Sequence, residues 1–191
     1  QGKFIRQSGG RGQFGDVTLR IEPLEAGSGL VFESEITGAT LPTEYFGPVE
    51  QGFKEAAQSG VVAGHPVVDI KAILIDGSHH EVDSSEVAFK IASSMAFKEA
   101  CQKASPFILE PVMLMEVVTP EEFLGDVLGD LQSRRAQVQS MEPQAGLQIV
   151  KAHVPLAETF QYATILRSNT TGRASFTQEL DHYAPAPMKD K

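Results

Sequence analysis

The sequence predicts an α+β protein of two domains. Segments that alternate apolar and polar side chains, as strands do, are interleaved with segments whose apolar side chains recur at helical spacing. A stretch bracketed by prolines, 105–111, interrupts this succession. We therefore expect one domain at residues 1–110, a second at 111–188 and a disordered tail at 189–191.

The first domain should begin with strands and a helix. A glycine-rich turn at 27–29 is expected to join two of its strands. Apolar residues at helical spacing predict a helix over 42–59, which Gly60 would end. The segments that alternate apolar and polar side chains, and are therefore predicted strands, are 2–8, 16–23, 30–37 and 65–77.

The last helix of this domain starts at a capping signal, DSSE at 83–86. Asp83 can cap the first turn, and Glu86 stands three residues on, as in a capping box. The helix should run to Lys103, with Met95 and Cys101 filling the core. Its apolar stripe is Ala88, Ile91, Ala92, Met95, Ala96 and Ala100.

The second domain has the order β-α-β-β-α-β, which is that of a ferredoxin-like domain. Thr119 should cap its first helix, with Pro120 in the first turn, and a second helix is expected over 156–168. The proline-rich end, 184–191, should be unstructured. The predicted strands are 111–118, 135–142, 147–155 and 172–183.

The charge is unevenly distributed. The chain carries a net −9, yet residues 1–20 carry a net +3, which leaves −12 for the rest. An acidic body disfavours a general nucleic-acid binder, but a small basic region can still touch phosphate. No apolar run reaches 18 residues, so no membrane span is expected. Cys101 is the single cysteine, which excludes a disulfide within the chain and favours a cytoplasmic protein.

The segment GGRGQFGDV, 9–17, matches the glycine patterns of dinucleotide-binding proteins and of protein kinases. The first pattern needs a helix after the glycines, but a strand is predicted there. The second needs a lysine soon after, and Lys71 comes far too late. The sequence has no P-loop and no recognisable nucleophile or acid–base motif. We therefore expect neither a nucleotide cofactor nor catalysis in this chain.

Two interpretations of the glycines remain: a plain hairpin tip, or a loop that approaches a partner closely. The run 8–12 holds more glycine than a tight hairpin needs. Arg11 and Gln13 add a charged fork and an amide on otherwise bare backbone. That combination suits contact with ribose, phosphate or a base edge.

A second loop, 76–85, carries the pair His79-His80. A metal site with Glu81 or Asp83 as third ligand is conceivable, but adjacent residues of an extended segment point in opposite directions. Asp83 is also needed as the helix cap. We therefore expect no metal here, and interpret the histidines as exposed side chains that stack on or hydrogen-bond to a partner.

Four long motifs resemble bacterial translation elongation factor G, in the order found in its last two domains. The resemblance implies a piece of a ribosome-dependent GTPase whose GTP and Mg²⁺ are bound by a domain that this sequence does not include. It also implies a ribosomal-protein-S5-like fold for 1–110 and a ferredoxin-like fold for 111–188. The motifs occupy 2–17, 64–92, 119–135 and 154–176.

The same resemblance implies which residues meet the ribosome. Two tip loops of the first domain would contact the codon–anticodon helix of tRNA and mRNA in the small-subunit decoding region. Arg167 and Arg173 would contact large-subunit RNA near the stalk base. His79 stands where the family commonly has an aromatic, and Gln161 where it usually has glycine. The tip residues are Ser8, Gly9, Gly10, Arg11, Gly12, Gln13, Gly77, Ser78, His79, His80 and Glu81.

The expected function is therefore translocation of tRNA and mRNA by the parent protein, with the ribosome as partner and neither DNA nor a membrane. A related factor for ribosome recycling or tetracycline-type ribosome protection is an alternative, although the Gly-Gly-Arg-Gly-Gln loop favours the translocase. A stand-alone RNA-binding module or an enzyme in its own right are alternatives from other classes.

Overall fold

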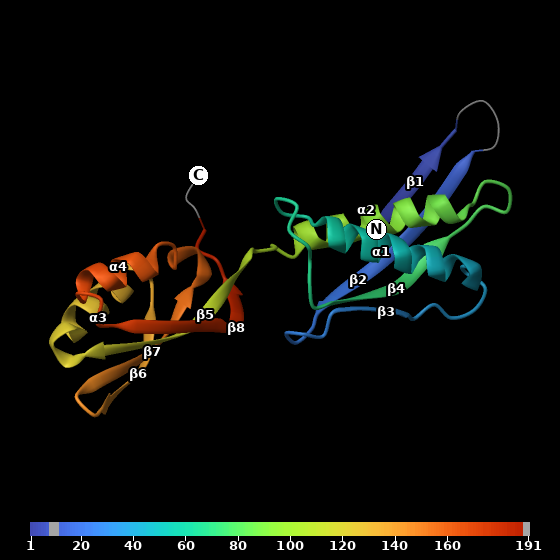
Figure 1. Cartoon of the computed structure of the whole chain (residues 1–191). Helices are drawn as coiled ribbons and strands as arrows, with labels where there is room; N and C mark the ends of the chain where they lie inside the picture. The colour runs from blue at the N-terminus through green and yellow to red at the C-terminus, as the bar shows by residue number, and fades with distance from the viewer. Residues whose placement is uncertain (8–11, 189–191) are drawn as a thin grey trace. The chain divides into compact units, whose positions relative to one another are not determined.

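Two separate four-stranded sheets organise the described chain. The computed structural model describes residues 1–7 and 12–188 (Figure 1). It divides into unit 1, residues 1–106, and unit 2, residues 107–191. Each unit packs its own sheet against two α-helices. The predicted α+β class is thereby confirmed.

Unit 1 has the sheet order β1-β2-β4-β3, in which β3 and β4 run parallel. The turn at 27–29 joins β2 to β3 as expected, although the two strands do not pair, because β4 lies between them. The amide of Gly29 donates to the Asp69 carboxylate (2.9 Å), which ties this turn to the start of β4. The elements are β1 Gly2–Arg6, β2 Gln13–Pro23, β3 Leu30–Ser34, α1 Phe46–Ser59, β4 Ile70–Ser78 and α2 Glu86–Lys103.

Helix α2 starts and packs differently from the prediction. Ser85 is the N-cap, and its hydroxyl accepts from the amide of Ala88 (3.2 Å), so the prediction of Asp83 as cap was wrong. The buried face is centred on Phe89 and Phe97, because turning the large rings inward buries the most apolar area. Met95 is consequently 44% exposed, against the expectation that it fills the core.

Cys101 does fill the core of unit 1 and is 4% exposed. Burial raises the pKa of its thiol to about 11, because the low-dielectric surroundings disfavour the thiolate. At neutral pH this thiol is therefore protonated and unreactive.

Unit 2 confirms the predicted β-α-β-β-α-β succession. Its sheet has the order β6-β7-β5-β8 with all neighbours antiparallel, and the helices pack on one face of it (Figure 1). The elements are β5 Leu109–Pro120, α3 Leu124–Ser133, β6 Gln137–Gln144, β7 Leu147–Pro155, α4 Tyr162–Asn169 and β8 Ser175–Pro185.

Strand β5 is longer at both ends than expected. At its C-terminal end Thr119 and Pro120 pair with β7, so Thr119 is not a helix cap. At its N-terminal end the boundary placed at 110/111 falls inside the strand, because Pro111 pairs with β8 alone. A proline is tolerated there since no β7 partner needs its missing N–H.

Strand β8 continues to Pro185, and the amide of Ala186 donates to the carbonyl of Ile108 (2.9 Å). The expectation that the chain is unstructured from 184 was therefore wrong for these residues. Main-chain pairing with β5 holds them, whatever their side chains. The tail predicted at 189–191 lies outside the described residues. Across the described ranges, no helix combines the length and apolar character needed to cross a membrane.

Residues 107–191 produced alone should unfold in one cooperative transition, because unit 2 has its own core, formed around Met115, Leu131 and Tyr162. Urea unfolding followed by circular dichroism is the measurement. The shorter piece 112–191 loses the pairing of Leu109–Pro111 with β8 and should be less stable by about 1–3 kcal/mol. A gradual, non-cooperative loss of signal from 107–191 would contradict the separate core.

Candidate functional site

The two predicted tip segments lie at the same end of unit 1. Strand β1 ends where Arg6 pairs with Gln13 of β2, and β2 runs on to pair Asp16 with Ser78 of β4. The segments 12–13 and 77–81 are therefore neighbours across the sheet (Figure 1). Ser8, Gly9, Gly10 and Arg11, which were predicted at the same tip, lie outside the described residues.

Four residues join the two segments, and we call them the tip cluster: Phe14, His80, Asp83 and Ser84. The His80 ring packs on the Phe14 ring with centroids 4.0 Å apart and planes at 30°. The amide of Phe14 donates to the carbonyl of Asp83 (2.8 Å). Ser84 accepts from the amide of His80 (2.8 Å) and donates to the carbonyl of Phe14 (3.1 Å). The cluster thus fixes the position of His80 relative to the sheet.

The adjacent histidines turn toward different rings. His80 is exposed beyond its contact with Phe14, whereas His79 is half-buried, 6.5 Å from Tyr45. Tyr45 in turn stacks on Phe89 of the core at 4.3 Å. Burial, with smaller contributions from Glu44 and Glu86, raises the pKa of Tyr45, so its hydroxyl stays protonated. Of the two histidines, His80 is the one presented to solvent with Glu81.

The described glycines of the loop have packing reasons of their own. A Cβ on Gly15 would lie 2.7 Å from the carbonyl oxygen of Ala88, so glycine lets α2 approach the sheet. A Cβ on Gly12 would lie 3.3 Å from side-chain carbons of Gln7 and Asp83. At these two positions the nucleotide-like pattern reflects close approach between backbone and neighbouring elements.

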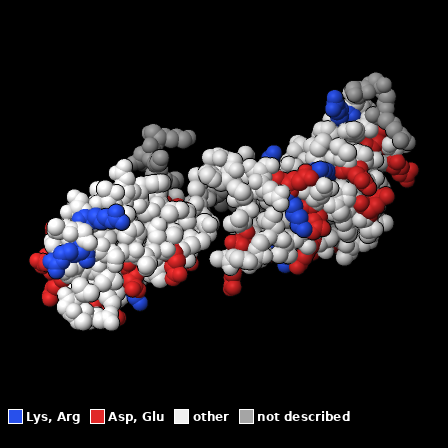
Figure 2. All heavy atoms as spheres, in the orientation of Figure 1, with Lys and Arg blue, Asp and Glu red and all other residues white. Residues whose placement is uncertain are grey.

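Sequence reasoning missed three residues of this end, namely Phe14, Lys3 and Ser84. Phe14 supports His80, and the Lys3 ammonium lies 5.5 Å from the centre of the Phe14 ring. Phe14 pairs with Ile5 and Lys3 with Asp16, so Lys3 and Phe14 are diagonal neighbours on adjacent strands, and no local sequence pattern reveals this contact. Figure 2 shows basic side chains beside the undescribed residues at the end of β1, and acidic ones over the helices of unit 1.

In unit 2 the predicted arginines flank the end of α4. Arg167 is exposed in the last turn of the helix, where a cation complements the helix dipole. Arg173 is exposed, pairs with Glu122 and lies 5.6 Å from the Phe123 ring centre. Such an exposed ion pair contributes at most about 1 kcal/mol to stability, so Arg173 can leave Glu122 and pair with an anionic group of another molecule.

Gln161 stands at the N-terminal end of α4 with φ at 58°, the left-handed conformation that glycine adopts freely. A non-glycine residue pays roughly 1–2 kcal/mol for it. The backbone at Gln161 therefore has the left-handed conformation expected of a glycine, although the residue carries a side chain.

Comparison with known proteins covers both units. Residues 1–105 match the family model of elongation factor G, domain IV, and residues 107–191 match that of the elongation factor G C-terminus. Among solved structures, the crystal structure of ttk003000868 from Thermus thermophilus is 48% identical, with a TM-score of 0.83. The match covers 97% of this chain and 28% of that one, so the chain spans less than a third of its neighbour's length.

Proposed function

The chain belongs to the elongation factor G family, and from this we propose that it is the ribosome-binding C-terminal part of a GTPase that moves tRNA and mRNA through the ribosome. Its two units are domain IV and the C-terminal domain of a translation elongation factor. In this proposal GTP and Mg²⁺ are bound by another domain of the parent protein, and the parent works in the cytoplasm.

The observation that carries the proposal is the supported, exposed His80 at the end of unit 1. Its ring stands on Phe14, and its backbone is held by Ser84. An exposed ring fixed in this way can stack on or hydrogen-bond to a nucleotide with little loss of side-chain entropy. His80 is thus preorganised for contact with the codon–anticodon helix.

The neighbouring groups suit RNA rather than a small molecule. The glycines of the run 8–12 allow its backbone to approach the shallow minor groove of RNA. Gln13 offers a side-chain amide to ribose or to a base edge. Lys3 adds positive charge near the phosphates. In this proposal the tip holds the codon–anticodon helix after translocation and prevents tRNA and mRNA from moving backward. GTP hydrolysis in another domain of the parent positions unit 1 for this contact.

Unit 2 would supply a second contact. Arg167 and Arg173 lie on either side of the turn that follows α4, and both side chains are exposed. Guanidinium groups pair well with phosphate, which fits the proposed contact with large-subunit RNA near the stalk base.

The proposal is tested by tethering an iron chelate to a cysteine introduced at Glu81 of the full-length parent. Hydroxyl radicals produced there on the ribosome should cut small-subunit RNA around the decoding site. The buried Cys101, whose pKa is raised to about 11, will not take up the reagent at neutral pH. Primer extension reads the cuts.

The matched control is Gln58→Cys, near the C-terminal end of α1. Contacts of Tyr45 with Phe89 and of Phe53 with Phe97 show that α1 and α2 run in the same direction, so Gln58 lies far from the tip. It should leave the decoding site uncut. Equal cutting of that site from both positions, or none from Glu81→Cys, would refute the proposed placement.

A further inference from the structure

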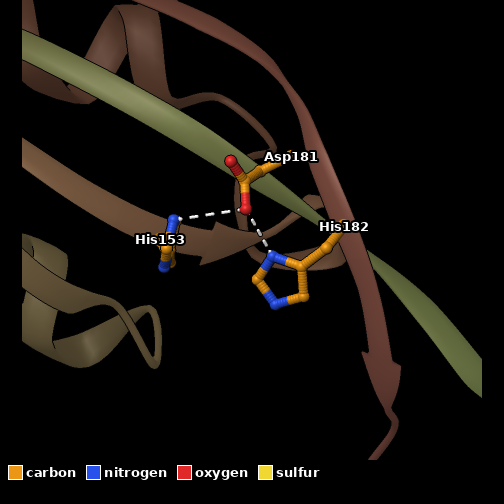
Figure 3. Close-up of side chains that lie close together, drawn as sticks. All are labelled: His153, Asp181 and His182. Carbon is orange, nitrogen blue, oxygen red and sulfur yellow. Dashed lines mark hydrogen bonds and ion pairs between the residues drawn. The ribbon is translucent and has the colours of Figure 1, made fainter. Parts of the chain in front are cut away.

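Unit 2 brings two histidines and an aspartate together on strands that are not neighbours in its sheet. Figure 3 shows the side chains of His153, from β7, and His182, from β8, turned toward the carboxylate of Asp181. One oxygen of that carboxylate lies 3.4 Å from His153 Nε2 and 2.6 Å from His182 Nδ1. One potential ligand atom from each residue lies within 4.8 Å of the others.

A β-bulge in β8 creates this arrangement. Val112 of β5 pairs with His182 and Met113 with Leu180, which leaves Asp181 as an extra residue. In a regular strand Asp181 and His182 would point to opposite faces of the sheet. The bulge re-aims the strand locally, so both side chains reach the same face.

The third residue lies on that face as well. In β7 the neighbours of His153, Ala152 and Val154, are fully buried in the core under the helices. Alternation therefore places His153 on the face away from the helices. It is paired with Leu114 of β5, so the three side chains span β5 and connect β7 with β8.

We propose that His153, Asp181 and His182 bind a divalent transition metal of the zinc class. Two imidazole nitrogens and one carboxylate oxygen form a donor set that Zn²⁺ accepts, with water as fourth ligand. Ligands at tetrahedral Zn²⁺ are about 3.3 Å apart, given bonds of about 2.0–2.1 Å. The His153–Asp181 separation of 3.4 Å already meets this spacing.

Binding requires one local change. The short contact between His182 and Asp181 is a hydrogen bond, and the ion would take the place of its proton, with the two groups separating slightly. The side chains of His153, Asp181 and His182 are 26%, 36% and 45% exposed, so an ion can enter from solvent. The carboxylate offsets one of the two charges brought by the ion.

The bound ion cross-links β7 and β8 over β5 and should stabilise unit 2 against unfolding. This role is independent of ribosome binding, since it depends only on the sheet of unit 2.

The test is titration of the whole chelator-treated chain with ZnCl₂ by calorimetry, and with CoCl₂ by visible absorption. One equivalent of each metal should bind, and Co²⁺ should give the strong bands of four-coordinate nitrogen–oxygen ligation. Saturating Zn²⁺ should raise the unfolding midpoint of unit 2 and leave that of unit 1 unchanged.

Variants assign the ligands. His153→Gln and His182→Gln should each weaken Zn²⁺ binding at least tenfold, and the nearly isosteric Asp181→Asn should also weaken it. His65→Gln, at an exposed histidine of unit 1, is the matched control and should bind as the unaltered chain does. Unfolding curves without metal verify that each variant is folded.

Three results would overturn the site. The unaltered chain could bind neither metal at stoichiometric concentration. Binding could persist unchanged in His182→Gln or Asp181→Asn. Binding could instead be lost in a His79→Gln, His80→Gln double variant, which would place the metal on the tip loop.

Discussion

Replacing Gly52 by alanine should destabilise unit 1 by about 3 kcal/mol, a large fraction of a domain's stability. Gly52 lies where α1 crosses α2, and a Cβ there would stand 2.2 Å from the carbonyl oxygen of Lys90. That oxygen belongs to the backbone of α2, so no side-chain rotation relieves the clash. The helices must move apart, which loosens the packing of Phe53 on Phe97. Urea unfolding of the whole chain measures the effect.

Gly129→Ala is the matched control. Gly129 is exposed in the interior of α3, and a Cβ there meets no atom within 4 Å. Alanine should therefore raise the stability of unit 2 by up to about 1 kcal/mol through its better helix propensity. If Gly52→Ala were as harmless as Gly129→Ala, the close crossing of α1 and α2 would be disproved.

The second large effect concerns movement on the ribosome. His80→Ala in the full-length parent should slow translocation about ten- to a hundredfold, because loss of a stack or hydrogen bond to RNA costs about 1–3 kcal/mol. GTP hydrolysis should be nearly unchanged, since in our proposal another domain performs it. Rapid kinetics of both steps on one ribosome preparation is the measurement.

Two further variants distinguish a contact of His80 with RNA from its packing on Phe14 and from nonspecific effects of losing a histidine. His80→Phe keeps a ring to pack on Phe14 but lacks ring nitrogens, so it distinguishes stacking from hydrogen bonding. His65→Ala removes an exposed histidine outside the tip and should leave both steps unchanged. Equal slowing of hydrolysis and translocation by His80→Ala would mean that the tip governs binding, and an unchanged translocation rate would exclude a role for His80.

Most elements of the fold could be predicted because side-chain periodicity reports them directly. Partners of strands could not always be predicted, because alternation in β3 says nothing about which strand lies beside it. The capping signal at 83–86 offered several candidates, and only the backbone geometry selects Ser85 over Asp83. Pairing of Ala184 and Pro185 with β5 depends on main-chain groups, so a proline-rich composition misled the prediction.

The sites divide in a similar way. The two loops stood out by their glycines, Arg11 and Gln13, and by the pair His79-His80, and the family resemblance then implied that they meet the ribosome; their RNA contacts stay a prediction. Phe14 and Lys3 were not identified, because the register of β1 against β2, and no local sequence pattern, brings them together. His153 and His182 were missed for a further reason: the bulge at Asp181 breaks alternation, and nothing in the sequence marks a bulge there.

The hydrogen bonds of the tip cluster bear on how the tip can evolve. Apart from the hydroxyl of Ser84, they use only main-chain groups of Phe14, His80, Asp83 and Ser84. The side chains of Glu81 and Val82 are exposed and take no part in these bonds, whereas the Ser78 hydroxyl donates to the Asp16 carboxylate (3.0 Å). Residues 81 and 82 can therefore drift or be selected for new chemistry while the loop keeps its place, whereas Ser78 and Ser84 are constrained by their hydrogen bonds. Divergence within the loop should alter what the tip recognises sooner than where the tip stands.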